Sequence, residues 1–471
     1  MYPTLGRIWF ASVLVLALGL SGCAGAPQNS PAAPAATSAP AATSAAPPAT
    51  VGAVSAAPTT ASVAAPASLS GEITYAWWGT TAFRNEVTQQ VITLFQQKYP
   101  NVKVDPSIAD FNTHFQKLTV SAAAGDLPCL PQMQSTGLAQ FADPKILRPL
   151  DDLVESKVID TSNVPKGVVD TGRGFDGKLY MIPTGVFSRV DFYDDALLQQ
   201  TGIAPPAETW TWDQYKTTMT QIQAKLPSGV NAVENNGGDM NPLVTWVLSH
   251  GEPVFQQKAL GFGKPTLAAW FQFWEDLRTA GVATSETEVA ERQPPLELHP
   301  VSTGGAVFGS YAPNQVAGVQ AALTKSGKPG TIQLIKEPNG PAGSGDAIGT
   351  NGLTIGANCD NVPASAAFIN FFLNDPQAAA AYKSDNGAVS VQPLLLTQIN
   401  DPTSSPSLIA QLKFQQHLTS GGFVKDIKYA AGYSALPPLL TTTYENVAFG
   451  RMTIPAAVDD FFNQANAILN K

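Results

Sequence analysis

Residues 72–104 read EITYAWWGTTAFRNEVTQQVITLFQQKYPNVKV, and this stretch decides the fold class. Its first seven residues form a short run rich in apolar and aromatic side chains, which is typical of a strand. Apolar residues then recur at helical spacing from Val87 to Phe95, until Pro100 ends the helix. Residues 102–104 alternate like a second strand. The stretch therefore predicts a strand, a helix and a second strand.

The same alternation continues downstream. Phe115 and Leu118 mark a second helix that ends at Gly125, and a short strand flanked by prolines follows at residues 128–133. Further along, Thr211 opens a helix with the sequence pattern of a capping box. Helices and strands that alternate in this way predict an α/β fold with a mainly parallel sheet.

The N-terminus has the pattern of an export signal. Arg7 precedes an apolar run over residues 8–18, which is too short for a transmembrane helix of ~20 residues. The run leads into Leu20-Ser21-Gly22-Cys23, which resembles the lipobox of bacterial lipoproteins. The resemblance implies that residues 1–22 are a signal peptide and that Cys23 is lipidated and anchors the protein to the outer face of the cell membrane. The alternative is an ordinary secreted protein.

The segment after Cys23 has an unusual composition. Residues 24–70 contain no charged and no aromatic residue and are rich in alanine, proline, serine and threonine. Such a segment cannot bury enough apolar surface to offset the entropy lost on ordering. We therefore expect residues 23–70 to be a lipidated, disordered tether.

Composition narrows the function classes. Signal and tether leave about 400 residues, which favours two domains. The formal net charge of −9 argues against nucleic acid and against an anionic membrane surface as partners. The four histidines are scattered without metal-ligand spacing, so we expect no metal and no cofactor. Apart from Cys23, the cysteines are Cys129 and Cys359, which are either one disulfide or two buried thiols.

The order of motifs resembles the extracellular solute-binding proteins of ABC importers, in the sugar-binding family that includes maltose-binding protein. The likeness covers the chain from Gly71 to the C-terminus. Four stretches show it: FQQKYPNVKV at 95–104, GDLP at 125–128, DGKLYMIP at 176–183 and GLTIG at 352–356.

The resemblance implies an α/β, type II periplasmic-binding-protein-like fold of two lobes, with a hinge of crossing strands and a ligand cleft between the lobes. Lobe 1 is expected at residues 71–183 and 347–405, and lobe 2 at residues 184–346 and 406–471. In this fold the strand after Cys129 lies beside the strand before Cys359, so the resemblance also implies a disulfide between them.

Sugars are recognised by aromatic platforms and by planar hydrogen-bonding side chains. Positions that face the cleft in the family correspond here to Trp77, Trp78, Asp110, Asn112, Gln134, Ser135, Asn241, Trp246, Tyr311 and Tyr433. Each aromatic residue among them could instead belong to the core, and each polar one could cap a helix or turn. Arg189 and Asp191, just after the expected hinge, could contact the ligand or could instead form an ion pair with each other. Leu243 stands where maltose-binding protein has an aromatic residue, which casts doubt on maltose-like chains as the ligand.

These features predict a monomeric lipoprotein that captures a mono- or oligosaccharide and delivers it to the permease subunits of an ABC transporter. We expect no catalytic residues. The alternative is a lipid-anchored, secreted, carbohydrate-active hydrolase, which would need two carboxylates ~5–9 Å apart across a cleft. The sequence has no Gly-x-Ser-x-Gly motif and no recognisable histidine constellation that would favour a hydrolase.

Overall fold

The computed structural model describes residues 69–79, 82–285, 296–420, 425 and 427–470, all within one compact unit of the chain. The expected signal peptide, Cys23 and nearly all of the expected tether lie outside the described residues. Within the described part of the chain, no helix is long and apolar enough to cross a bilayer.

The larger sheet has six strands in the order β12-β4-β11-β3-β1-β2. Strand β1 pairs in parallel with β2 and β3, whereas β11 is antiparallel to both β3 and β4, and β12 is antiparallel to β4. The sheet is therefore mixed, and the prediction of a mainly parallel sheet is wrong, because β4, β11 and β12 join it from distant parts of the chain. Its strands are β1 (Gly71–Trp78), β2 (Val102–Ala109), β3 (Leu130–Gln134), β4 (Met181–Ser188), β11 (Ile348–Thr354) and β12 (Ala388–Val389).

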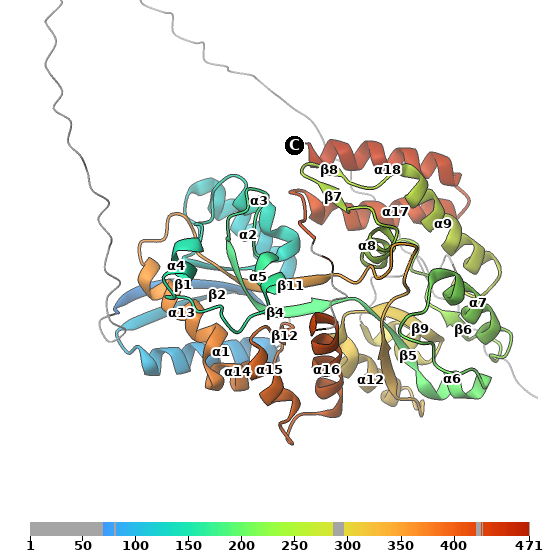
Figure 1. Ribbon diagram of the computed structural model, residues 1–471, viewed down its shortest axis with the longest axis horizontal. Helices are drawn as coiled ribbons and strands as arrows, with labels where there is room; N and C mark the ends of the chain where they lie inside the picture. Colours follow the sequence, from blue (N-terminus) through green and yellow to red (C-terminus); the bar gives the residue numbers. More distant parts are fainter. Residues whose placement is uncertain (1–68, 80–81, 286–295, 421–424, 426, 471) are drawn as a thin grey trace, which may run out of the picture. The chain divides into compact units, whose positions relative to one another are not determined.

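Helices cover both faces of this sheet (Figure 1). Alternate side chains of β1 point to opposite faces. Tyr75 and Trp77 therefore pack with Phe95 of α1 and Phe368 of α13, while Ala76 packs towards α2 and α3. The helices of this lobe are α1 (Ala82–Lys98), α2 (Phe111–Ala124), α3 (Leu138–Ala142), α4 (Asp151–Glu155), α5 (Lys166–Asp170), α13 (Val362–Asn374), α14 (Pro376–Tyr382) and α15 (Gln392–Ile399).

Helix α2 ends where the sequence predicts. Gly125 follows its last residue in the left-handed conformation, with φ of 71°, and its N–H bonds back to the carbonyl of Ala122. A residue with a side chain would be strained there, so the glycine stops the helix.

The smaller sheet has four strands in the order β10-β5-β9-β6. Both β9 and β10 are antiparallel to β5, and β6 is parallel to β9. The carboxyl ends of β6, β9 and β10 therefore lie at the edge where β5 begins. The strands are β5 (Val190–Asp194), β6 (Asn231–Val233), β9 (Ala306–Tyr311) and β10 (Ile332–Ile335).

The helices of the second lobe enclose a core built largely from aromatic side chains, among them Trp270, Phe271 and Trp274. The capping box predicted at Thr211 is confirmed, since its hydroxyl accepts from the N–H of Gln214 and the Gln214 side chain accepts from the N–H of Thr211. The helices are α6 (Asp195–Thr201), α7 (Trp212–Gln223), α8 (Met240–Ser249), α9 (Lys264–Thr279), α11 (Pro300–Thr303), α12 (Val316–Lys325), α17 (Leu436–Ala448) and α18 (Ile454–Leu469).

Short elements complete the fold. A small hairpin is formed by β7 (Phe255–Gln256) and β8 (Ala259–Leu260), and single 3₁₀ turns are η2 (Ser135–Gly137), η3 (Leu296–Leu298), η4 (Pro313–Gln315) and η5 (Tyr433–Ala435). Helix α16 (Pro406–Ser420) contacts β4 and β12 of the larger sheet and β10 of the smaller one.

The chain passes from one sheet to the other at a single residue. Strand β4 ends at Ser188 and β5 begins at Val190, so only Arg189 lies between them. Strand β4 thus continues past the lobe boundary expected at residues 183/184. The return crossing lies between Ile335, the end of β10, and Ile348, the start of β11.

A disulfide joins Cys129 to Cys359, with an Sγ–Sγ distance of 2.05 Å and a Cα–Cα distance of 4.7 Å. Cys129 directly precedes β3, and Cys359 follows β11, which pairs with β3 in antiparallel register. The neighbouring strands therefore bring together two residues that are 230 positions apart in the sequence.

Candidate functional site

The residue between the two sheets, Arg189, is half-buried, and no described residue accepts a hydrogen bond or ion pair from it. Burial raises the pKa of Glu337, Tyr429 and Tyr433, and the positive charge of Arg189 opposes this rise at each of them. The ion pair with Asp191 that the sequence allowed is not formed. Arg189 thus places an unpaired guanidinium at the junction of the lobes.

The two tyrosines beside Arg189 connect the second lobe to the first. Their rings meet edge to face, with centroids 4.7 Å apart. Tyr433 belongs to η5, which contacts η2 of the first lobe, and Tyr429 lines a narrow gap with Ser135 and Phe175. Burial raises the pKa of Tyr429 to about 12, so both hydroxyls are neutral and can donate and accept hydrogen bonds.

Gln134 and Ser135 lie on the first-lobe side of this junction, as predicted. Gln134 Nε2 donates to Asn351 Oδ1 at 3.2 Å, and Ser135 Oγ accepts from the N–H of Thr350 at 3.1 Å. These bonds hold both side chains against β11. The structure therefore brings together three predicted residues, Gln134, Ser135 and Tyr433.

The carboxyl-end edge of the smaller sheet holds a cluster of four buried acidic residues, which we call the acidic cluster. Its members are Asp191, Glu234, Glu337 and Asp346, each exposed by 5% or less. Glu234 Oε1 accepts from the Tyr311 hydroxyl at 2.6 Å and from the N–H of Val301 at 2.9 Å. Tyr311 is thereby a partner of the cluster.

The other acidic residues are only partly paired. Glu337 Oε1 accepts from Ser310 Oγ at 2.7 Å, and Asp346 Oδ2 forms an ion pair with Lys336. One oxygen of each of Asp191, Glu337 and Asp346 is buried without a hydrogen-bond partner. Burial raises the pKa of all three carboxyl groups, that of Glu337 to about 7. Neighbouring carboxylates add to the rise at Asp191 and Glu337, whereas Lys336 opposes it at Asp346.

Each of the other aromatic residues predicted to bind the ligand packs inside its own lobe. Trp77 stacks on Tyr75 at 5.0 Å, and Trp78 lies against Phe111, His114 and Phe115. Trp246 packs among Trp212, Trp270 and Phe273, and Tyr311 stacks on Phe192 at 4.9 Å. All four are 7% exposed or less, so the structure gives them packing roles instead of an open face.

The polar predictions Asp110 and Asn241 act at helix starts. Asp110 is exposed and accepts from the N–H of Thr113 at 3.0 Å, which caps α2, and Asn112 is exposed on the first turn of the same helix. Asn241 Nδ2 donates to Asp239 Oδ1 at 2.9 Å. Since the charge of Asp239 raises the pKa of Tyr433, the start of α8 lies near the junction.

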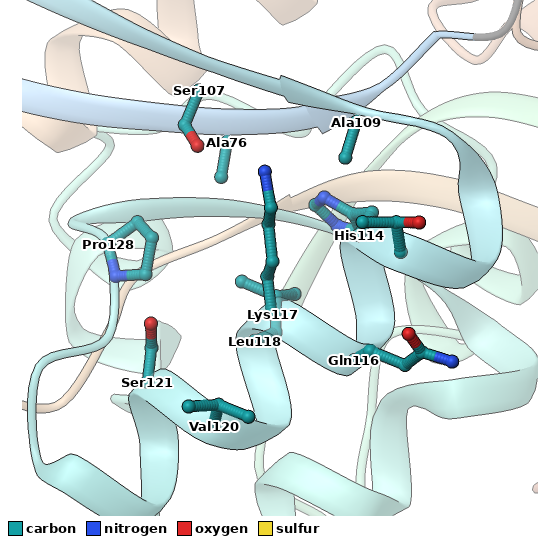
Figure 2. Close-up of a pocket in the computed structure, with 11 residues that line it drawn as sticks. Ala76, Ser107, Ala109, His114, Gln116, Lys117, Leu118, Val120, Ser121 and Pro128 are labelled. Carbon is teal, nitrogen blue, oxygen red and sulfur yellow. The ribbon is translucent and has the colours of Figure 1, made fainter. Parts of the chain in front are cut away.

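A separate groove of about 350 Å³ runs within the first lobe along α2 and the edge strand β2 (Figure 2). Lys117 extends across it towards Ser107 and Ala76. His114 also lines the groove, and burial lowers its pKa to about 4, so its ring is neutral at pH 7. The groove shares no lining residue with the junction.

Sequence reasoning did not assign three residues of the junction. Glu337 and Tyr429 belong to no motif, and for Arg189 the sequence left a ligand contact and an ion pair with Asp191 as alternatives. The available signal was Asp191, an acidic residue between apolar neighbours in VDFYD at 190–194, a strand that also ends on Asp194, since carboxylates are rarely buried without a reason.

The fold and the junction together define a two-lobed solute-binding protein. The comparisons agree, because the model of the family described as bacterial extracellular solute-binding protein matches residues 76–379. The chain belongs to this family.

Curated relatives are distant. A putative binding protein of Brucella abortus is 27% identical over 141 residues, 29% of this chain and 32% of its own, so the chain spans about a third of that relative. The arabinooligosaccharide-binding protein of Bacillus subtilis is 22% identical over 36% of this chain and 39% of its own. An uncharacterized lipoprotein of Streptomyces antibioticus is 24% identical over 61% of this chain and 63% of its own.

Solved structures share the fold over nearly their whole length. A family 1 extracellular solute-binding protein of Alicyclobacillus acidocaldarius matches with a TM-score of 0.69 and 22% identity, over 85% of this chain and 99% of its own. An ABC substrate-binding protein of Listeria monocytogenes in complex with cycloalternan matches with a TM-score of 0.69 and 19% identity, over 85% of this chain and 99% of its own. The GacH receptor of Streptomyces glaucescens, solved unliganded and with acarbose, matches with a TM-score of 0.68 and 19% identity, over 86% of this chain and 99% of its own.

Proposed function

We propose that this protein captures a carbohydrate at the junction of its lobes and delivers it to the permease subunits of an ABC transporter. One observation supports the proposal above others: Glu337 Oε2 is buried without a hydrogen-bond partner, and the charge of the half-buried Arg189 acts on the same carboxyl group. A buried polar group without a partner is costly, so a ligand that donates to Glu337 and accepts from Arg189 would be bound favourably.

A sugar has the chemistry that these groups require. Each hydroxyl can accept from the Arg189 guanidinium and donate to the Glu337 carboxylate, and the C–H face of the ring can pack on Tyr429 or Tyr433. Gln134 and Ser135 would add amide and hydroxyl groups from the first lobe. Among relatives, the Bacillus protein is named an arabinooligosaccharide-binding protein, and the Listeria protein was solved in complex with cycloalternan.

The mode of attachment is also part of the proposal. The Leu20-Ser21-Gly22-Cys23 sequence and the uncharged segment after it support a lipid anchor on Cys23 at the outer face of the cell membrane, and one relative is named a lipoprotein. Processing of the wild-type protein that is sensitive to globomycin would support the anchor. Membrane retention of the wild type that is lost in Cys23→Ala would support it as well. Equal membrane retention of the variant would contradict it.

The test of function is a thermal-shift screen of the mature protein against a library of mono- and oligosaccharides. A ligand at 100 times its Kd stabilises the native state by about 2.7 kcal/mol, which is readily seen as a higher Tm. Recovery of the unchanged sugar would support the binding protein, whereas cleavage products would favour the hydrolase alternative. A library in which no sugar raises Tm would contradict the proposal.

A further inference from the structure

The ligand site proposed above has an excess of carboxyl groups on the side of the second lobe. The acidic cluster contributes Asp191, Glu234, Glu337 and Asp346. The permanent cations that face it are Lys336, which pairs with Asp346, and Arg189, whose charge acts on Glu337. His299 lies 3.9 Å from Glu234. Among the residues that the structure describes, four carboxyl groups therefore face these two permanent cations.

Buried carboxyl oxygens without a hydrogen-bond partner distinguish this cluster from the rest of the described chain. Within the described part of the chain, the buried carboxyl oxygens that lack a hydrogen-bond partner belong to Asp191, Glu337 and Asp346 alone. Asp346 already has the ammonium of Lys336 on its other oxygen. Asp191 and Glu337 have no such cation bonded to them, and both are 3% exposed or less.

A buried carboxyl group without a donor is unfavourable, and two changes relieve it. The group can keep its proton, as the raised pKa values of Asp191 and Glu337 indicate for the empty protein. Alternatively, a cation that enters the site can replace that proton. An ammonium group suits this role, because it has three N–H donors and a full positive charge.

Glu337 lies close to the junction, because it is two residues past Ile335, which pairs with Asp191 of β5. It is within the field of Arg189, which also acts on Tyr429 and Tyr433, and these tyrosines meet the first lobe at η2 and Ser135. A ligand held at the junction would therefore place a substituent against Glu337, with Asp191 behind it.

We propose that the natural solute carries an amino group, as an amino sugar or an aminated oligosaccharide does, and that Glu337 binds this group. The same field disfavours solutes with carboxylate or phosphate groups. This inference rests on the proposed function, since it specifies the ligand of the same site.

The wild-type protein provides the first test, and it does not depend on the folding of any variant. Isothermal titration at low ionic strength compares matched probes: glucosamine, glucose and glucuronate, the galactose equivalents, and the disaccharides of deacetylated chitin, cellobiose and digalacturonate. The amine of the best-binding series should bind at least about tenfold more tightly than its neutral analogue, a difference of about 1.4 kcal/mol. The acid should bind most weakly.

Two isosteric variants locate the effect. Glu337→Gln and Asp191→Asn each remove one carboxyl group from the cluster and should bring the ratio of the Kd values for the neutral sugar and its amine towards one, whatever the affinity of each variant for the neutral sugar. Asp459→Asn is the matched control, because it removes a carboxylate from an exposed ion pair with Lys264 in the same lobe. It should leave the preference unchanged.

The outcomes separate this inference from the proposed function. Neutral sugars that bind as tightly as their amines, or acids that bind more tightly, overturn the inference and leave the proposed function standing. A preference that persists in both cluster variants also overturns it. If no sugar of any charge binds, the proposed function fails and the inference fails with it.

Discussion

At the scale of single residues, Arg189 is distinguished by its position, because it is the one residue between strand β4 of the larger sheet and strand β5 of the smaller sheet. A residue there is fixed by both lobes and still reaches the space between them. Its guanidinium offers five N–H donors, none of which is used by a described residue. The side chain is therefore available to a ligand without breaking an existing bond.

Arg189→Gln tests this role. The variant should bind the ligand at least about tenfold more weakly, since it loses charge-assisted hydrogen bonds worth about 1.5–3 kcal/mol, while Tm changes little. Titration calorimetry and a thermal melt measure the two effects. Arg451→Gln, at an exposed site beside Phe449, is the control and should bind like the wild type. If Arg189→Gln binds the ligand as tightly as Arg451→Gln does, Arg189 does not contact the ligand.

Asp191→Asn tests the buried acid through stability. The folded-state pKa of Asp191 is raised above its unfolded value, so as pH rises from about 4 the unfolded chain ionises first and the folded state loses relative stability. Tm of the wild type should therefore fall between pH 5 and pH 8 by more than Tm of the variant does. Parallel pH dependences for both proteins would show that Asp191 has an ordinary pKa.

At the scale of elements, helix α8 illustrates how tertiary packing decides the role of a residue. From the sequence alone, Trp246 is either a ligand platform or a core residue, and the first interpretation predicts that replacing it weakens binding without unfolding the protein. In the structure its ring is 7% exposed and packs among three aromatic side chains of α7 and α9. The helix therefore uses this tryptophan to hold the core of the second lobe.

Trp246→Ala should consequently lower the free energy of unfolding by about 3–5 kcal/mol, the range for removing a large buried aromatic side chain. Urea denaturation measures this loss. Trp246→Phe, which keeps a ring in the cluster, should recover most of it. A variant with wild-type stability and weakened sugar binding would restore Trp246 to the ligand site.

At the scale of the whole molecule, the first lobe is closed by a covalent link between distant parts of the chain. The second lobe is inserted between the two halves of the first, so the disulfide between Cys129 and Cys359 spans 230 residues. A cross-link over so long a loop removes much conformational freedom from the unfolded chain. It should hold β3 and β11 together while the second lobe unfolds or moves.

The double variant Cys129→Ser, Cys359→Ser should be less stable by about 2–5 kcal/mol, with its ligand affinity little changed. Denaturation with and without reducing agent provides the comparison, since reduction should affect the wild type and not the variant. Labelling of the exported protein should find no free thiol at either position. Two free thiols and no effect of reductant would show that the bond does not form.

The sequence by itself determined the alternation of strands and helices, the helix ends at Gly125 and Thr211, and the family. These features depend on local periodicity, on turn and capping chemistry and on motif order, all of which are written within short stretches. Gln134, Ser135 and Tyr433 were predicted from the resemblance to the family, because they follow strands or motifs that the family places at its cleft.

Only the tertiary structure decided which aromatic residues are core, and it alone assembled Arg189, Glu337 and Tyr429. The same apolar pattern serves a tryptophan in a core and one on a ligand platform, so sequence cannot separate them. The acidic cluster arises because antiparallel β5 begins at the edge where β6, β9 and β10 end. That juxtaposition joins residues more than a hundred positions apart, and no local pattern encodes it.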